Sequence, residues 1–174
     1  MKGYITALLG ILVLSGCTLT EPIPVKGEVV DCAAIKVVGG DAEPLECLGG
    51  GTPVPVDGIR GPALINVWGT WCAPCKEELP HLAHFLQKSD GSVQVIGIAV
   101  EEKSPESVKR FIERNGMSWP VLYDEKGSTR STFGMGVPVT WFVDGEGKVV
   151  HKKYGPFRST EEIQLAVAKY LGKR

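Results

Sequence analysis

The chain has 174 residues, with 19 Lys plus Arg against 20 Asp plus Glu and a formal net charge of −1. This length suits one domain with a substantial core rather than two. The charges are balanced and form no polybasic patch, so we expect no nucleic-acid partner.

The first sixteen residues differ in kind from the rest. Lys2 precedes an apolar stretch from Tyr4 to Leu14 that is too short to span a bilayer comfortably, and small residues follow it. This pattern predicts a signal peptide over residues 1–16. Its end, Leu-Ser-Gly-Cys, resembles a bacterial lipobox, which predicts cleavage before Cys17 and attachment of a lipid to its sulfur. A plain signal peptide with an incidental cysteine and an uncleaved anchor are the alternatives.

Two segments with weak patterns follow. Residues 17–26 contain Pro22 and Pro24 and show no periodicity, so they predict a flexible tether. Residues 27–57 contain short β-branched runs interrupted by glycine pairs, which predict an N-terminal hairpin or loop extension. We expect this extension to belong to one domain that covers residues 27–174.

Beyond residue 58 the signals for regular elements become sharp. Apolar runs predict buried strands, proline at a first helical position and a capping box predict helix starts, and Asp-Gly-Glu-Gly predicts a hairpin turn. The expected elements are strands at 63–68, 93–100, 119–123, 139–143 and 148–154, helices at 73–87, 105–114 and from 160 on, and a helical turn at 128–133. Their order predicts an α/β fold with a mixed central sheet and helices on both faces.

Cys72 and Cys75 carry the chemistry, because they lie three positions apart at the start of the helix expected at 73–87. The first turn of a helix brings the two sulfurs within bonding reach, and the helix N-terminus favours a thiolate at Cys72. A thiolate beside a resolving thiol is the minimum machinery for thiol–disulfide exchange. Zinc is the alternative, but it needs a second Cys or His pair at ligand spacing. We therefore expect no metal and no cofactor besides this redox-active pair.

Five cysteines are an odd number for an exported protein. With Cys17 assigned to lipid and Cys72 and Cys75 to redox chemistry, Cys32 and Cys47 remain, and structural disulfides persist outside the cytoplasm. A bridge between them would close a loop of about 15 residues and add roughly 3 kcal/mol of stability. Two free buried thiols and a second redox pair are the alternatives.

Residues 66–80 read Asn-Val-Trp-Gly-Thr-Trp-Cys-Ala-Pro-Cys-Lys-Glu-Glu-Leu-Pro. This segment resembles the active-site motif of the TlpA/ResA-like thiol–disulfide oxidoreductases of the thioredoxin superfamily. The resemblance in element order covers the chain from about Gly58 onward. The strand and helix between Val93 and Asn115 resemble the central insertion of this branch. A thioredoxin-like fold and a membrane-anchored bacterial enzyme are what the resemblance implies.

The same resemblance implies roles for further residues. Val137 and Pro138 match the family's cis-proline segment, whose backbone pairs with the extended chain of the substrate; an ordinary trans proline is the alternative. Glu78 matches the active-site glutamate that tunes the cysteines and handles protons, against a solvated helix carboxylate. Trp71 is expected to shape the rim beside the cysteines. Asn66 stands where thioredoxin has a buried aspartate, so proton transfer should depend on Glu78 and water.

In the implied mechanism, Cys72 is the exposed nucleophile and Cys75 the more buried resolving thiol. Family analogy favours a reductase of protein disulfides, for example in cytochrome c maturation, that receives electrons from a membrane donor. We expect a monomer, lipid-anchored on the extracytoplasmic face of the cell membrane.

Two other functions of the same fold are alternatives. A peroxiredoxin-like peroxidase needs an isolated peroxidatic cysteine, whereas Cys75 here is preceded by Cys72. A copper chaperone of the related fold uses a wider Cys-x-x-x-Cys spacing and a distant histidine. The spacing in this chain therefore favours a dithiol site.

Overall fold

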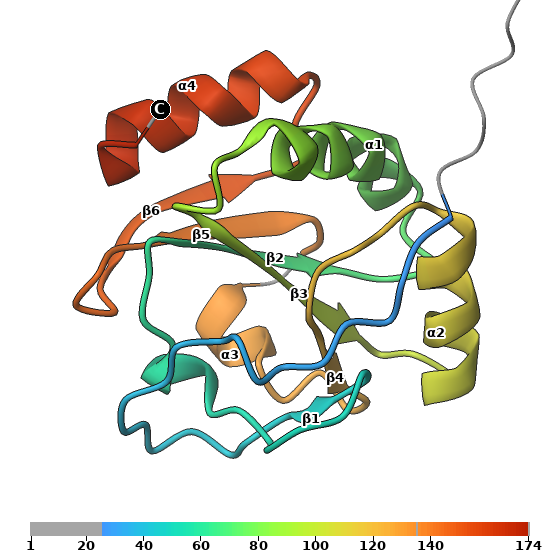
Figure 1. Cartoon of the computed structure of the whole chain (residues 1–174). Coiled ribbons are helices and arrows are strands. Elements are labelled where there is room, and N and C mark those ends of the chain that lie inside the picture. The colour runs from blue at the N-terminus through green and yellow to red at the C-terminus, as the bar shows by residue number, and fades with distance from the viewer. Residues whose placement is uncertain (1–25, 135, 174) are drawn as a thin grey trace, which may run out of the picture.

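A six-stranded mixed sheet forms the centre of the computed structural model, which describes residues 26–134 and 136–173 (Figure 1). The strands are β1 (Glu46–Cys47), β2 (Ala63–Trp68), β3 (Gln94–Val100), β4 (Val121–Asp124), β5 (Val139–Val143) and β6 (Val149–Tyr154). Their order across the sheet is β1-β4-β3-β2-β5-β6. Strands β2, β3 and β4 run parallel, whereas β1, β5 and β6 are antiparallel to their neighbours.

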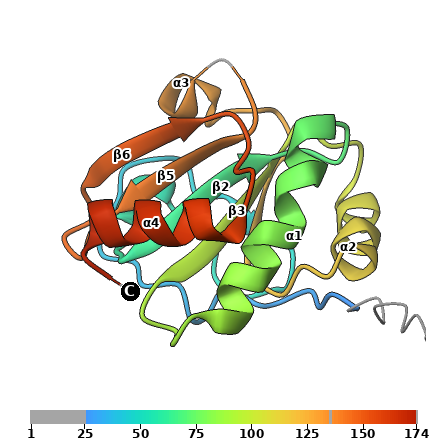
Figure 2. The same cartoon turned by 90° about the horizontal axis from the view of Figure 1, so that it is seen from above.

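Helices cover both faces of this sheet. They are α1 (Ala73–Lys88), α2 (Pro105–Arg114), α3 (Arg130–Phe133) and α4 (Thr160–Leu171), with a 3-10 turn η1 (Val56–Gly58). Figures 1 and 2 both show α1 and α4 side by side over one face, and α2 contributes to the same apolar layer. α3 and the N-terminal extension pack on the opposite face. The expected α/β architecture is confirmed.

The predictions for the N-terminus fall outside the residues that the structure describes. These are the signal peptide at 1–16, lipidation at Cys17 and the tether at 17–26, of which only Lys26 is described. Within the described ranges, no helix combines the length and the apolar character that crossing a bilayer requires.

From residue 63 onward the elements follow the expected order, and their boundaries shift by at most two residues. One such shift has a clear cause. The helical turn expected from Ser128 begins at Arg130. The N–H groups of Ser128 and Thr129 donate instead to the carboxylate of Asp124, at 2.8 and 2.9 Å. Asp124 thus holds these two residues in a turn ahead of α3.

Side-chain caps start the helices where the sequence predicts them. Ser104 Oγ accepts a hydrogen bond from the N–H of Ser107 before α2, and Ser159 Oγ accepts one from the N–H of Glu162 before α4. These bonds satisfy N–H groups that the first turn of a helix leaves unpaired. The capping box of α4 is altered, because the Glu162 carboxylate accepts from the N–H of Arg158 and not from that of Ser159.

The apolar layer beneath α1, α2 and α4 is closely packed around the centre of the sheet. Trp68 and Trp119 are fully buried there, and Gly97 of β3 leaves room for both indoles. A Cβ at Gly97 would lie 2.9 and 3.3 Å from their Nε1 atoms. Trp141 is buried in the layer on the other face. Trp68 and Trp141 thus belong to the core on opposite faces of the sheet.

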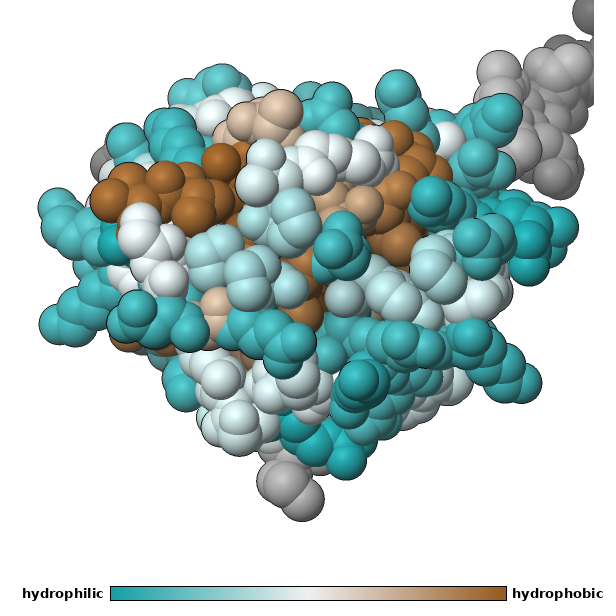
Figure 3. Space-filling model, turned by 90° about the horizontal axis from the view of Figure 1, so that it is seen from below, coloured by the Kyte–Doolittle hydropathy of each residue, from teal (hydrophilic) through white to brown (hydrophobic). Residues whose placement is uncertain are grey.

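Of the two forms expected for residues 27–57, the structure contains a loop layer. Leu45 and Val54 form a single antiparallel bridge, and β1 pairs with β4 at the edge of the main sheet, which the sequence did not indicate. Figure 3 shows the molecule from below, where hydrophilic residues cover most of the surface and hydrophobic ones lie in separate patches. The exposed large hydrophobic residues of the extension are Val37 and Val38.

A disulfide joins Cys32 and Cys47 within this extension. Cys32 is buried, and Cys47 lies in β1, so the bridge attaches the first loop of the extension to the edge of the sheet. The two chain segments are in close contact, since a Cβ at Gly49 would lie 2.1 Å from the carbonyl oxygen of Val30. The bridge closes a loop with a sequence separation of 15.

We predict that removing this bridge destabilises the domain. The double substitution Cys32→Ala/Cys47→Ala should lower the free energy of unfolding by about 3 kcal/mol, because the unfolded chain gains the entropy that the loop had constrained. Urea unfolding at neutral pH measures the change. The matched control is Cys72→Ala/Cys75→Ala, which opens a loop with a separation of only 3 and should cost less. A larger loss in the control would contradict the prediction.

Candidate functional site

The disulfide between Cys72 and Cys75 lies at the junction between β2 and α1. Cys72 is the N-cap of α1, and its Sγ accepts a hydrogen bond from the N–H of Cys75 at 3.2 Å. Pro74 lies in the first turn, where a missing N–H has no cost to the helix. When the pair is reduced, this N–H and the helix dipole favour negative charge on Cys72.

The burial of the two cysteines corrects one expectation. Cys72 is 4% exposed and Cys75 is completely buried, so the order of exposure is as expected, but Cys72 is not an exposed residue in the disulfide form. Both belong to the apolar layer under α1, and the bond to Cys75 holds the Cys72 sulfur against it.

Glu78 lies on α1 three residues after Cys75, on the same side of the helix, and is completely buried. Its Oε1 accepts a hydrogen bond from Asn66 Nδ2 at 2.7 Å, and its Oε2 accepts one from the N–H of Phe157 at 3.0 Å. Burial raises the pKa of Glu78 from an ordinary 4.5 to about 7, against the opposing effect of these two hydrogen bonds. The carboxyl group can therefore both hold and release a proton near neutral pH.

A row of polar residues runs sideways across the sheet from Glu78. Asn66 of β2 pairs with Thr140 of β5, which pairs with Lys153 of β6. Asn66 Nδ2 also donates to Thr140 Oγ1 at 3.0 Å, and Lys153 Nζ forms an ion pair with Glu162 at 3.3 Å. The sequence indicated Asn66 and Glu78 but not Thr140 or Lys153, because register across three strands has no local signal.

Trp71 forms part of the rim beside the disulfide. Its side chain is 53% exposed, and its Nε1 donates to the carbonyl oxygen of Val100 at 3.2 Å. The indole lies over Gly69, where a Cβ would be 2.7 Å from Nε1, so glycine is required for this arrangement. Glu77, in contrast, is an exposed helix carboxylate that pairs with Arg158.

The segment before β5 has the backbone form that the resemblance implied. The Val137–Pro138 peptide bond is cis, and the carbonyl oxygen of Pro138 accepts a hydrogen bond from the N–H of Gly155 at 2.9 Å. Val137 and Trp71 both line a small cavity of about 50 Å³. The Gly61–Pro62 bond is also cis, which no sequence feature indicated.

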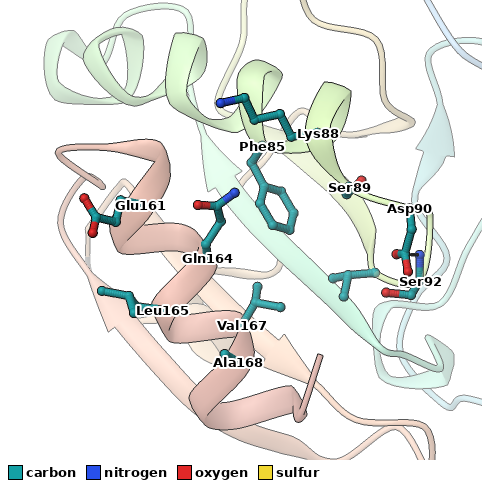
Figure 4. Close-up of a pocket in the computed structure, with 11 residues that line it drawn as sticks. Phe85, Lys88, Ser89, Asp90, Ser92, Glu161, Gln164, Leu165, Val167 and Ala168 are labelled. Carbon is teal, nitrogen blue, oxygen red and sulfur yellow. Dashed lines mark hydrogen bonds between the residues drawn. The ribbon is translucent and has the colours of Figure 1, made fainter. Parts of the chain in front are cut away.

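A wider cavity of about 450 Å³ lies between the C-terminal half of α1 and α4 (Figure 4). Phe85 and Val167 line it together with Leu165, and Lys88 and Glu161 are among its charged residues. Neither redox cysteine nor any residue bonded to Glu78 lines it, so it is separate from the disulfide site. Within residues 26–134 and 136–173, no group of three or more His, Cys, Asp or Glu side chains is arranged to hold a metal ion.

The sequence did not indicate one buried carboxylate, Glu102, that lies close to the redox disulfide loop. Glu102, in the connection between β3 and α2, is buried and accepts hydrogen bonds from Thr70, two residues before Cys72. It lies 32 positions from Thr70 in a run of charged residues, so its sequence context is that of an exposed loop.

Comparison with known proteins agrees with this geometry. The family model Redoxin matches residues 40–169. The chain is 31% identical to the thiol-disulfide oxidoreductase ResA of Bacillus thuringiensis over 126 residues, which cover 71% of this chain and 69% of that protein. It is 36% identical to the thiol:disulfide interchange protein DsbE of Allochromatium vinosum, over 63% of this chain and 62% of that protein.

The fold is also that of solved structures. The crystal structure of StoA from Bacillus subtilis superposes with a TM-score of 0.59 at 23% identity, covering 71% of this chain and 93% of that one. The thioredoxin-like fold is thereby confirmed. The family match, the ResA relative and the disulfide at the start of α1 agree, and the chain belongs to the redoxin family as a thiol–disulfide oxidoreductase of the ResA/DsbE type.

Proposed function

We propose that this oxidoreductase is a membrane-anchored reductase of protein disulfides outside the cytoplasm, for example in cytochrome c maturation. The observation that carries the assignment of roles is the hydrogen bond from the N–H of Cys75 to Cys72 Sγ at the N-cap of α1. It favours a thiolate on Cys72, the less buried of the two sulfurs, and so supports Cys72 as nucleophile and Cys75 as resolving thiol.

The proposed cycle begins with the reduced pair. The Cys72 thiolate attacks one sulfur of a substrate disulfide, that bond breaks, and the released substrate thiolate takes up a proton. The Cys75 thiolate then attacks Cys72 Sγ, which forms the Cys72–Cys75 disulfide and releases the second substrate thiol. Two electrons have passed to the substrate, and an electron donor at the membrane must reduce the pair again.

Glu78 supports the proton steps of this cycle. Its pKa of about 7 allows it to accept the proton that Cys75 must lose before it attacks, one helical turn away. A carboxylate at this position also opposes negative charge on the thiolates, which disfavours the reduced pair relative to the disulfide. A pair that gives electrons away readily is a reductase, so this electrostatic effect supports the proposed direction.

Substrate binding is proposed at the rim formed by Trp71, Val137 and Pro138. Trp71 is half-exposed, and Val137, next to the cis bond, lines the same small cavity. We expect the backbone at Val137 to pair with an extended substrate chain. The proposed anchor is a lipid on Cys17, joined to the domain by residues 18–26. The supporting observation is the lipobox-like end of the apolar N-terminal stretch.

Single cysteine substitutions test the proposed roles. Cys72→Ser should abolish reduction of insulin disulfides, because the attacking thiolate is lost. Cys75→Ser should accumulate mixed disulfides with the substrate, because the second attack cannot occur. Non-reducing electrophoresis with mass spectrometry detects the trapped species. Comparable trapping by Cys72→Ser would reverse the two roles, and full activity of Cys72→Ser would refute the proposed function.

Replacing Glu78 tests its proton chemistry. Glu78→Gln should lower the pH at which Cys72 becomes reactive, since the variant has no carboxylate to oppose the thiolate. The measurement is the rate of Cys72 alkylation between pH 4 and 9. Glu77→Gln is the matched control, because Glu77 is exposed on the same helix. If both variants keep the wild-type profile, Glu78 does not act on the cysteines.

The same variant makes a separate prediction about stability. The pKa of Glu78 is raised in the folded protein, so its ionisation opposes folding, with no cost below pH 4.5 and the full cost above pH 7. Glu78→Gln should therefore gain stability relative to the wild type as pH rises through this window, by on the order of 3 kcal/mol. Urea unfolding at pH 4.5 and 8 measures the difference. A constant difference would contradict the raised pKa.

The proposed anchor has its own test. Cys17→Ala should leave the chain as an uncleaved precursor or release it from the membrane, because the sulfur that carries the lipid is absent. Intact-mass analysis of membrane and soluble fractions from the native host measures both outcomes. A mature wild-type chain without acyl mass would refute the lipoprotein assignment.

A further inference from the structure

The loop that leads into the redox disulfide is tied to the end of β3. β2 and β3 pair side by side as far as Trp68 and Ala99, after which the two strands separate. The N–H of Thr70, beyond the last pair, donates to Oε1 of Glu102 instead of to a neighbouring strand. The hydroxyl of Thr70 donates to Oε2 of the same carboxylate at 2.6 Å. Beyond the end of β2, the Glu102 side chain thus supplies the hydrogen-bond acceptor that a neighbouring strand would otherwise supply.

The position of these bonds links them to the redox cysteine. The N–H of Cys72 donates to the carbonyl oxygen of Gly69 at 3.1 Å, so residues 69–72 form one tight turn with Thr70 inside it. Trp71, the next residue, donates from its indole to Val100 at the end of β3. Holding Thr70 therefore limits where both the Trp71 ring and the Cys72 sulfur can lie.

Glu102 is buried to 6% exposure, which is unusual for a carboxylate. None of the ion pairs in the described part of the chain involves it. Its two oxygens accept from Thr70 instead. Burying a carboxylate without a cation is costly unless hydrogen bonds compensate. Thr70 therefore stabilises Glu102 in its buried position, and Glu102 in turn holds Thr70 in the turn.

Glu101, the residue before Glu102, connects the same segment to α3. Glu101 has a φ of 54°, in the left-handed region that non-glycine residues seldom adopt, and its carboxylate forms an ion pair with Arg130 of α3. Arg130, Trp71 and Val137 all line the same small cavity. The turn after β3 thus contacts the disulfide loop through Glu102 and contacts α3 through Glu101.

We propose that Glu102 is a positioning residue for the exchange reaction, which holds the turn before α1 so that Cys72 stays at the helix N-terminus and Trp71 stays beside the cavity. The inference rests on the proposed role of Cys72 as nucleophile. The hydrogen bonds of the Glu102 carboxylate go to Thr70 and not to the redox cysteines. It acts through its two hydrogen bonds to Thr70.

Three variants separate the hydrogen bonds from the charge. Glu102→Ala removes both bonds. Glu102→Gln removes the charge but can keep both, since its Oε1 can accept from the N–H of Thr70 and its Nε2 can donate to the hydroxyl. Thr70→Val removes the hydroxyl donor alone. Glu106→Ala is the matched control, because Glu106 is an exposed carboxylate in the first turn of α2.

We expect kcat/KM for insulin reduction to fall about 10-fold in Glu102→Ala, because the variant loses hydrogen bonds to a charged group. Glu102→Gln should stay within about threefold of the wild type. The double variant Glu102→Ala/Thr70→Val should be no slower than Glu102→Ala, because both changes break the same contact. Glu106→Ala should match the wild type.

The pH profile of Cys72 alkylation distinguishes positioning from a structural role. Both Glu102 variants lack the charge, so their difference isolates the hydrogen bonds. The apparent pKa of Cys72 should be higher in Glu102→Ala than in Glu102→Gln, since a loosened sulfur loses the N–H of Cys75 and the helix dipole. A role in stability alone would lower the melting temperature of Glu102→Ala and leave its profile and rate equal to those of Glu102→Gln, which would overturn the proposal.

If Glu102→Ala does not fold, Thr70→Val and Thr70→Ser provide the test. Serine keeps the hydroxyl and should match the wild type, whereas valine should be slower by about threefold. Equal rates for the two would overturn the proposal. Failure of the proposed function can be distinguished from failure of the role of Glu102, because Cys72→Ser would retain activity only if the proposed function is wrong. Loss of activity in Cys72→Ser with a normal Glu102→Ala would refute only the role of Glu102.

Discussion

The arrangement around the redox disulfide depends on the buried Glu78 carboxylate and its two hydrogen bonds. A buried acid needs hydrogen-bond donors, and here they come from β2 through Asn66 and from the segment before α4 through Phe157. Since Glu78 lies on α1, one side chain joins this helix to the central strand β2 and to the segment before α4. Burial in the layer that stabilises the fold also raises the pKa of this carboxyl group to about 7. Packing and proton chemistry therefore cannot be changed independently at this position.

Most of the fold follows from signals that are local in sequence. The strands at 63–68 and 139–143 are continuous apolar runs, and Ser104 and Ser159 start their helices by capping. Such features depend on neighbours within a few residues, so sequence patterns report them well. The redox role of the two cysteines followed from their spacing at a helix start, whereas the cis Val137–Pro138 bond was expected from the family resemblance.

The parts that sequence patterns did not indicate all depend on contacts between distant residues. β1 is two residues long, and its pairing with β4 requires the edge of a sheet that is already formed. Strand register places Thr140 beside Asn66 and Lys153 beside Thr140. The ends of two parallel strands place Glu102 beside Thr70. The local sequence around Glu102 is that of an exposed charged loop. Only the folded structure shows that its carboxylate is buried against Thr70.

The short strand β1 also protects the sheet from association with other chains. An open edge strand offers unpaired N–H and C=O groups on which a second polypeptide can add, and this leads to aggregation. β1 covers part of that edge by pairing Glu46 and Cys47 with β4, and the disulfide to Cys32 keeps it there. Reducing conditions strong enough to open this bridge would free β1 and expose β4. The structural disulfide thereby keeps the edge of the sheet covered in a protein that itself carries out thiol–disulfide exchange.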